Sequence, residues 1–400
     1  MTSLHQRPSY ILPLIVLSQF AGTSLWFAGN AILPDLQREL QLTGNAISNI
    51  TSVVQLGFIS GTLVFAIFSI ADRYHPSRVF FISSLLAALA NASIVWIAKD
   101  FVTLLELRFL TGFFLAGIYP VGMKIAADWY EQGLGKALGF LVGALVLGTA
   151  FPHLLKGSRY ELPWKQVLYI TAAVAAAGGL LMLLLVPEGP FRKRGTVFHP
   201  RALMHIFRSE RFRAAAGGYF GHMWELYTFW AFIPLLLQVH QQHTNTRYDI
   251  PLWSFIIIGV GAISCVAGGY YSQKYGSAKV AFFALLGSGI CCAVYPLLLQ
   301  INAGVFLLFM VIWGIMVIAD SPQFSALVAQ TAPKENRGTA LTIVTCIGFA
   351  ITIVSIQLLG YILERYQSNL TFLLLVPGPI IGLRMLYKLL VAPRLKPVQK

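Results

Sequence analysis

Long apolar runs recur along the whole 400-residue chain, and they restrict its fold more than any other feature. Each run holds about 20 residues, enough for a helix to cross roughly 30 Å of hydrocarbon. The runs are continuous and do not alternate, which favours helices over the strands of a membrane barrel. Charged residues make up only 11% of the chain, whereas they are about a quarter of an average soluble domain. The sequence therefore predicts an all-α polytopic membrane protein.

Twelve transmembrane helices are predicted, six on each side of a basic interval. The first six are 10–33, 46–71, 78–98, 101–127, 137–156 and 166–187, and the second six are 214–238, 252–272, 280–300, 303–329, 339–361 and 369–391. The interval between them carries Arg192, Lys193, Arg194, Arg201, Arg208, Arg211 and Arg213. We therefore expect an N-terminal six-helix bundle at 1–187, a cytoplasmic basic linker at 188–213 and a C-terminal six-helix bundle at 214–400.

The distribution of charge predicts the orientation of the chain. A net charge of +14 could suggest a nucleic-acid partner, but the basic residues concentrate in short loops on one side of the predicted spans. This is the bias that cytoplasmic loops show. These loops contain Arg7, Arg73, Arg78, Lys136, Lys274, Lys279, Lys334 and Arg337. We expect a multi-pass protein of the cell (inner) membrane with both termini in the cytoplasm, and no nucleic-acid partner.

The two halves of the chain repeat one another. The segment Ile70–Phe81 aligns with Tyr271–Phe282, and four regions match in the same order at a nearly constant offset. The matched pairs include Arg73 with Lys274, Tyr74 with Tyr275, Pro34 with Pro234, Gly112 with Gly314 and Pro120 with Pro322. Two parallel six-helix repeats joined by a cytoplasmic segment are typical of secondary transporters.

With these features the chain resembles the major facilitator superfamily over its whole length. The family's loop motif between helices two and three reads Gly-x-x-x-Asp-Arg-x-Gly-Arg-Arg. The first copy here keeps Asp72 and Arg73 with Arg78 further on, while Phe68 and His75 replace the glycines; the second keeps Gly269, Lys274 and Gly276, while Gln273 replaces the acid. The resemblance implies a gating role for Asp72, Arg73, Arg78, Lys274 and Gly276.

Helix four carries Arg108 four residues before Gly112, which resembles the family's Arg-x-x-x-Gly signature, whose arginine is implicated in proton coupling. The resemblance also implies that helices one, four, seven and ten line a central cavity. A buried guanidinium needs a carboxylate, a substrate anion or water, although a fixed structural partner would also serve. Tyr119 shares the face of Arg108. Lys124, with Asp128 four residues on, is interpreted as half of a surface ion pair.

On helix one, Gln19, Trp26 and Asn30 fall within about 40° of one another at the usual helical rotation. A polar and aromatic stripe of this kind suggests a cavity wall. The same residues would also suit hydrogen bonding between helices, and Asn30 would suit the membrane interface. Both interpretations stay open.

Helix seven holds the densest cluster of functional side chains, namely His222, Trp224, Glu225, Tyr227 and Trp230. Glu225 lies near mid-span, where a carboxylate is costly to ionise and is therefore suited to reversible protonation. His222 lies three residues away and could share or relay that proton. The alternative is a carboxylate held permanently by a buried cation, without a role in transport.

Helix ten offers Trp313, Asp320 and Gln323, with Pro322 between the last two. Proline removes a helical donor, so a bend is expected there. Asp320 just before the bend could serve the transport pathway or could cap the broken turn locally.

These residues predict a secondary active transporter of a small polar or amphipathic solute, working by alternating access and coupled to protons. Glu225 is the first candidate for the protonating group and Asp320 the second. The alternatives are an uncoupled uniporter or organic-anion exchanger and, from another class, a membrane receptor or enzyme that does not transport. No phosphate loop and no Cys/His metal spacing occur in the sequence. We expect a monomer in the lipid bilayer that is not an enzyme and has no cofactor or metal.

Overall fold

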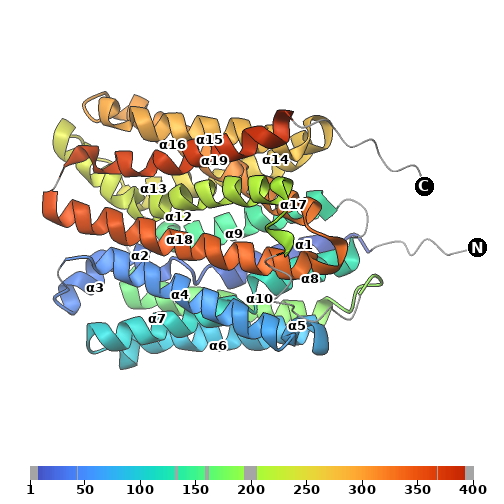
Figure 1. The fold of residues 1–400 in the computed structure, drawn as a ribbon. Coiled ribbons are helices and arrows are strands. Elements are labelled where there is room, and N and C mark those ends of the chain that lie inside the picture. Colours follow the sequence, from blue (N-terminus) through green and yellow to red (C-terminus); the bar gives the residue numbers. More distant parts are fainter. Residues whose placement is uncertain are drawn as a thin grey trace, which may run out of the picture.

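The computed structural model describes residues 8–42, 44–130, 134–157, 162–192, 205–366 and 368–391, and within these ranges its regular secondary structure is helical. The helices run roughly parallel to one axis and form a single bundle (Figure 1). Residues 193–204 of the predicted linker, with Lys193, Arg194 and Arg201, lie outside the described ranges. The linker boundaries therefore stay a prediction.

Each of the twelve predicted spans corresponds to a helix or to a helix with a break. The first six are α1 (Ile11–Thr23) with α2 (Ala28–Ala31), α4 (Ala46–Ile67), α6 (Pro76–Ile97), α7 (Phe101–Leu115) with α8 (Tyr119–Trp129), α9 (Leu134–Lys156) and α10 (Trp164–Leu185). Two short helices, α3 (Leu33–Glu39) and α5 (Ile70–Arg73), lie in the loops between them.

The second six are α12 (Glu210–Thr244), α13 (Ile250–Gly259) with α14 (Gly261–Tyr275), α15 (Ser277–Val294) with the 3-10 helix η1 (Tyr295–Leu298), α16 (Ala303–Ala319) with α17 (Ser321–Thr331), α18 (Arg337–Tyr366), and η3 (Asn369–Leu375) with α19 (Pro377–Val391). A 3-10 turn, η2 (Lys334–Asn336), precedes α18.

Ten of these spans are long and apolar enough to cross a membrane, among the described residues. The other two spans do not meet both conditions, each for a different reason. Helix α1 is apolar but has only 13 residues, because the first span breaks at Ser24. Helix α12 has 35 residues and extends beyond the predicted 214–238 at both ends, and it carries the polar cluster around Glu225.

The fourth and tenth spans break at equivalent places. Pro120 is the second residue of α8 and Pro322 the second residue of α17. Proline has no N–H to donate, and its ring clashes with the preceding turn. The bend expected at Pro322 is therefore present, and the repeat places the same break before Pro120.

The equivalent glycines Gly112 and Gly314 both allow a close approach of two helix backbones, one in each half. A Cβ added at Gly112 would collide with the carbonyl oxygen of Val54 on α4, and one added at Gly314 would collide with that of Ile257 on α13. Small residues allow helix backbones to approach this closely where there is no aqueous hydrophobic effect to drive packing. The matched glycines thus position α7 and α16 against their neighbours.

The two sequence halves meet along two helix pairs, in which α4 packs against α18 and α9 packs against α13 and α14. Gly139 and Gly143 of α9 lie against the carbonyl oxygens of Cys265 and Ala262 on α14. On the other pair, Gln357 donates to Asn49 at 3.1 Å and to Ser52 at 3.0 Å. The junction is therefore close-packed and contains hydrogen bonds.

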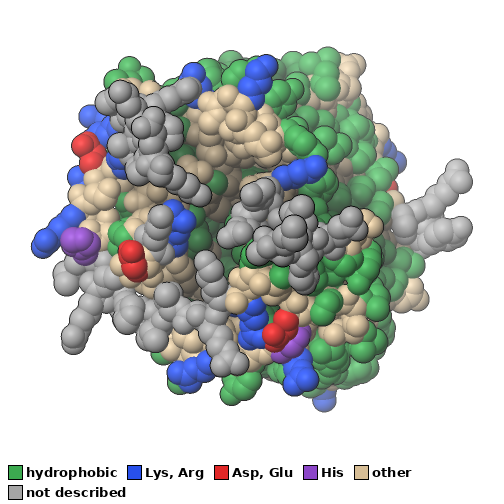
Figure 2. Space-filling model, turned by 90° about the vertical axis from the view of Figure 1, so that its right-hand side faces the viewer, with side chains coloured by type: hydrophobic (Ala, Val, Ile, Leu, Met, Phe, Trp, Pro, Cys, Tyr) green, Lys and Arg blue, Asp and Glu red, His purple; other side chains and the backbone are tan. Residues whose placement is uncertain are grey.

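Helix α1 begins and α19 ends at the same end of the bundle, here called the terminal end (right in Figure 1); the opposite end is called the distal end. Lys and Arg are spread over the terminal end and outnumber Asp and Glu there (Figure 2). Among the described residues, the terminal end carries Arg73, Arg78, Lys124, Lys136, Arg192, Arg208, Arg211, Arg213, Lys274, Lys279, Arg337, Arg384 and Lys388 against Asp72, Asp128, Glu188, Glu210 and Glu335. At the distal end, Arg38, Lys99, Lys156, Lys165, Arg247 and Arg365 are balanced by Asp35, Glu39, Asp100, Glu106, Asp249 and Glu364.

Candidate functional site

Glu225 lies on α12 and is only 1% exposed. Its Oε1 accepts hydrogen bonds from Trp313 Nε1 at 2.8 Å and Cys292 Sγ at 3.1 Å, and its Oε2 accepts one from Ser288 Oγ at 2.9 Å. These donors come from α15 and α16, so the carboxyl group joins three helices of the second half. No Lys or Arg is paired with it among the described residues.

His222 is paired with Asp320 and not with Glu225. Its Nδ1 lies 2.8 Å from Asp320 Oδ1, and the two side chains are 1% and 0% exposed. The i, i+3 spacing suggested that His222 would share a proton with Glu225, but helix α17 brings the second carboxylate to the imidazole instead. The pair must share one proton between them or remain an ion pair, because an isolated charge in hydrocarbon is costly.

The side chain of Asp320 makes no capping hydrogen bond, although Asp320 is the N-cap residue of α17. The local interpretation, in which Asp320 caps the broken turn, is therefore wrong. The break instead turns the carboxylate toward α12. Trp313 lies on α16, before the break, and its ring stacks on Phe229 with centroids 4.3 Å apart.

Arg108 is fully buried and bonds to backbone carbonyls rather than to a carboxylate. Its Nη1 and Nη2 each lie 3.2 Å from Leu25 O, Nη2 lies 2.5 Å from Trp26 O, and Nη1 donates to Asn91 Oδ1 at 3.1 Å. Leu25 and Trp26 lie in the break between α1 and α2, where the carbonyls lack helical partners. Among the described residues, the carboxylate expected beside Arg108 is replaced by these carbonyls and the Asn91 amide.

The three polar positions of helix one have different surroundings. Asn30 donates from Nδ2 to Thr51 Oγ1 at 2.7 Å, which is the hydrogen bond between helices that was one of the two alternatives. Gln19 is fully buried on α1, and neither of its amide atoms has a hydrogen-bond partner in the described part of the chain. Trp26 faces the second half.

Trp26 belongs to an aromatic cluster that joins the two halves, which we call the aromatic junction. Its ring stacks on Tyr227 at 5.8 Å and on Phe349 at 5.7 Å, and it contacts Phe58 at 4.9 Å. Phe27 and Trp230 complete the junction, with their ring centroids 6.3 Å apart. Because these rings come from four different spans, the junction closes the bundle between the halves at this depth.

Three further predicted site residues lie on α8, α12 and α17. Tyr119 is partly buried at the start of α8. Trp224 points toward the last span, where its Nε1 donates to Leu374 O at 2.8 Å, so the structure separates it from the junction. Gln323 is buried on α17, with its Nε2 near Gly268 of α14.

In the predicted gating motif, Asp72 is paired within the first half. Its Oδ1 lies 2.6 Å from Lys124 Nζ on α8. The interpretation of Lys124 as a partner of Asp128 is therefore replaced by a contact between the loop motif and helix four. Arg73 and Arg78 are exposed, and Lys274 Nζ lies over the ring of Tyr275, 5.2 Å from its centroid.

Gly276 and His75 occupy equivalent positions in the two copies but have different backbones. Gly276 has φ +85°, which glycine adopts without strain, while His75 is extended with φ −63°. Arg192 donates to Tyr74 O at 2.9 Å and is paired with Glu188, which ties this loop to the end of α10. Partial burial, with the nearby charges of Arg192 and Arg78, lowers the pKa of His75.

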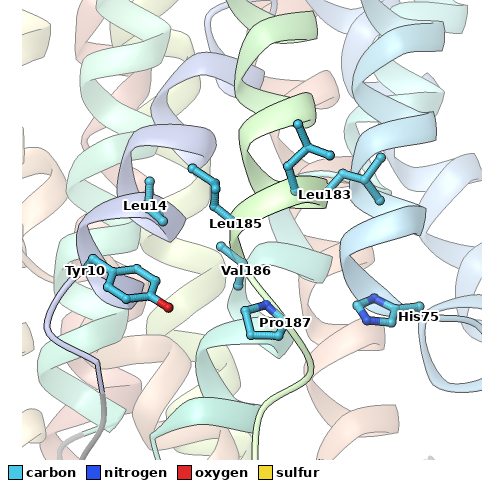
Figure 3. Close-up of a pocket in the computed structure, with 8 residues that line it drawn as sticks. Tyr10, Leu14, His75, Leu183, Leu185, Val186 and Pro187 are labelled. Atoms are coloured by element: carbon cyan, nitrogen blue, oxygen red, sulfur yellow. The ribbon is translucent and has the colours of Figure 1, made fainter.

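A surface groove of about 630 Å³ opens at the terminal end, beside the loop that carries His75 (Figure 3). It is lined by Tyr10, Leu14, His75, Leu183, Leu184, Leu185, Val186 and Pro187. None of the predicted site residues lines it. Within the described ranges, no three His, Cys, Asp or Glu residues gather to hold a metal ion.

Sequence reasoning missed the partners of the charged groups more than the groups themselves. Ser288 and Cys292, which bond to Glu225, and Asn91, which bonds to Arg108, carry no sequence signal beyond being polar residues inside apolar spans. That signal alone could have marked them, because such side chains need a partner in hydrocarbon.

Broken helices, repeated halves and buried ionisable groups are typical of the folds of secondary transporters. A sequence model described as Major Facilitator Superfamily matches residues 15–356, so the chain belongs to this family. It is an all-α, multi-pass membrane protein with the superfamily's fold, and the resemblance inferred from its sequence is confirmed.

Known proteins agree with this assignment. The chain is 23% identical over 277 residues to the uncharacterized MFS-type transporter YybF of Bacillus subtilis (strain 168), which covers 65% of each protein. It is 25% identical over 156 residues to the MFS-type transporter acdC of Aspergillus candidus, covering 38% of this chain and 30% of acdC. The matched region thus spans less than two thirds of the length of either relative.

Two solved structures have a similar fold. The human organic anion transporter MFSD10 (TETRAN) superposes with a TM-score of 0.72 at 15% identity, covering 95% of this chain and 100% of that one. A variant of the nucleoside transporter NupG gives a TM-score of 0.70 at 14% identity, covering 95% and 99%. These likenesses show that the chain shares their fold, in agreement with the family match.

Proposed function

We propose that this transporter moves a small amphipathic solute by alternating access and couples that movement to protons. The observation that carries the proposal is the pair of buried carboxyl groups, Glu225 and Asp320, without a Lys or Arg partner among the described residues. Ionised carboxylates in hydrocarbon are costly unless a cation matches them. Reversible protonation is the simplest way for these groups to remain buried in one conformation and to ionise in another.

The two carboxyl groups have different neighbours, and these neighbours affect how each group would release a proton. Glu225 accepts from three donors, which would support its ionised form once water reaches it. Asp320 has an imidazole beside it that can hold or pass on a proton. We therefore assign Glu225 as the first coupling site and the His222–Asp320 pair as the second.

The aromatic junction supports alternating access. Trp26 and Phe27 reach across to Tyr227 and Trp230, and α4 is hydrogen-bonded to α18 at its distal half. A solute crossing between the halves has to separate these contacts. In this conformation the distal side is closed, and rocking of one half against the other would open it.

The proposal also includes the orientation of the protein in the membrane. Among the described residues, the terminal end carries the excess of Lys and Arg, while the distal end is balanced in charge. Basic residues near span ends favour the cytoplasmic side. We place the terminal end and both chain termini in the cytoplasm, in the cell (inner) membrane, and we place the basic linker 188–213 between bundles 1–187 and 214–400. We also expect the protein to act as a monomer.

Arg108 favours a second candidate, the exchange of organic anions without proton coupling. Its guanidinium is buried without a carboxylate among the described residues, so the charge of a bound anion could offset it. Three hydrogen bonds to the helix-one break and one to Asn91 argue for a structural role first, and we rank this candidate below proton-coupled transport.

Reconstitution into liposomes with an imposed pH difference tests the proposal. Proton-coupled transport predicts that a panel of labelled amphipathic solutes contains at least one that accumulates above its external concentration only while the pH difference lasts. Exchange without coupling would show counterflow of the same solute and no effect of the pH difference. If no solute moves in either assay while the protein remains monodisperse, the transport proposal fails.

A further inference from the structure

The aromatic junction contains two buried indole N–H groups that have no hydrogen-bond acceptor among their described neighbours. Trp26 and Trp230 are 1% and 0% exposed, and their indole Nε1 atoms have no hydrogen-bond partner among the described residues. Buried donors without partners cost about 1–3 kcal/mol each and require an explanation. Two of them occur within a single cluster of rings.

The two indoles flank one side chain. Tyr227 lies 5.8 Å from the Trp26 ring and 5.3 Å from the Trp230 ring, centroid to centroid. Trp26 comes from the first half and Trp230 from the second, so the two indoles meet Tyr227 at the junction of the halves. A molecule bound between the halves would meet both.

Gln55 adds a third group to this region. It is fully buried on α4, and both of its amide atoms lack partners within the described part of the chain. Thr51 and Phe58 lie on the same helix face, since they are four residues before and three after it. Thr51 bonds to Asn30 and Phe58 contacts Trp26, which places Gln55 between two points that touch the first span.

These groups restrict the chemistry of a ligand. Indole N–H groups can only donate, so the ligand must supply acceptors. Here the Trp26 ring stacks on Tyr227 and Phe349, and Phe58 packs against Phe349. When the halves separate, a flat conjugated molecule would take the place of these ring contacts. We propose that the solute of this transporter is a planar aromatic compound with hydrogen-bond acceptors, bound between Trp26 and Trp230.

This inference rests on the proposed transport function, but it concerns binding and can be measured without transport. Three water-soluble probes of similar size test separately whether the ligand must be flat and whether it must carry hydrogen-bond acceptors. Naphthalene-2-carboxylate is flat and has acceptors. Naphthalen-2-ylmethylammonium is equally flat but can only donate. Decahydronaphthalene-2-carboxylate keeps the acceptors but is neither flat nor aromatic.

Titration of the purified full chain in detergent by calorimetry should give the tightest binding for naphthalene-2-carboxylate, by at least tenfold over the other two probes. Trp26→Phe and Trp230→Phe keep the ring and remove only the N–H. Each should weaken the binding of naphthalene-2-carboxylate about five- to tenfold and leave the weak binding of the ammonium probe unchanged. Trp96→Phe is the matched control, because Trp96 is 64% exposed on the outside of α6.

Equal affinity for the three probes, or an equal loss from Trp96→Phe, would overturn the inference. So would unchanged affinity of both junction variants, whose folding is checked by their thermal unfolding. Counterflow of labelled naphthalene-2-carboxylate separates the two proposals. Binding as expected without counterflow contradicts the transport function and leaves the site intact, whereas transport of another solute without this binding contradicts the site alone.

Discussion

Glu225 illustrates how a carboxyl group can be accommodated inside an apolar helix bundle. Its oxygens accept from an indole, a thiol and a hydroxyl on two other helices. These donors would stabilise the ionised form, but they bring no positive charge to offset it. The side chain is thus prepared for both protonation states, which is what a coupling group requires.

Glu225→Gln should therefore bind solute and exchange it across the membrane, but should not accumulate it. Glutamine keeps an acceptor for Trp313 but has no proton to release. The measurement is uptake driven by a pH difference alongside counterflow in the same vesicles. Glu106→Gln is the control, because Glu106 lies exposed on α7. Continued accumulation by Glu225→Gln would move the coupling site to Asp320.

The His222–Asp320 pair makes a prediction about stability. Removing one partner of a buried charge pair leaves the other without compensation, at a cost of about 3–5 kcal/mol. His222→Gln should therefore lower the thermal unfolding temperature strongly at neutral pH. His222→Gln combined with Asp320→Asn should recover part of that loss, since no charge then remains. A double variant no more stable than His222→Gln alone would show that the two side chains do not act as a pair.

At the scale of elements, the breaks in the spans matter as much as their lengths. Helix α1 stops at Thr23, and the carbonyls of Leu25 and Trp26 turn to Arg108. Trp26 and the next residue, Phe27, carry the rings that reach the second half. Arg108 is accordingly a positioning residue for the aromatic junction.

Arg108→Lys tests this role, because an ammonium group cannot reproduce the planar fork that holds both carbonyls. We expect a loss of stability of about 1–3 kcal/mol, the usual range for buried polar groups left without partners. We also expect stronger quenching of tryptophan fluorescence by iodide as Trp26 loosens. Arg38→Lys, at a side chain 78% exposed, is the control. If Arg108→Lys matches the natural protein in both measurements, Arg108 does not hold the break.

The loop element after α4 makes a separate prediction. Asp72 is paired with Lys124 at 2.6 Å, and both groups are partly exposed. Such a pair contributes about 1 kcal/mol at most, enough to bias a conformational equilibrium but too little to set the fold. Asp72→Asn and Lys124→Gln should each slow transport with little change in solute affinity. Exchanging the two residues, Asp72→Lys with Lys124→Asp, should restore part of the rate; normal turnover of the single variants would remove the pair from the gate.

At the scale of the whole molecule, the distal contact between α4 and α18 can be locked. A Cβ built at Gly360 lies 3.1 Å from Ser48 Cβ, close to the spacing of about 3.5–4.5 Å in disulfides. Ser48→Cys with Gly360→Cys should cross-link under oxidation and stop transport, and reductant should restore it. The native protein is the control without the new pair, because its described cysteines are buried and free. Transport that continues in the fully cross-linked protein would contradict alternating access at this end.

Much of the architecture follows from the sequence, because it depends on local rules. Span length, the prolines before the breaks and the matched glycines Gly112 and Gly314 act within one helix or between adjacent helices. The membrane leaves few alternatives to a helix for each apolar run. The break of the first span at Ser24 was not predicted, because neither a proline nor a glycine lies within Ser24–Phe27 and the stabilising partner, Arg108, is far away in sequence.

The sequence by itself determined which side chains would be expensive to bury, namely Arg108, His222, Glu225 and Asp320. Only the tertiary structure decided how each is satisfied. His222 lies three residues from Glu225 yet pairs with Asp320, and Arg108 meets the carbonyls of the first span instead of a carboxylate. The physical reason is that a helix fixes the direction of a side chain, whereas its partner depends on which other helices pack against that face, and this is settled by contacts between residues far apart in the chain.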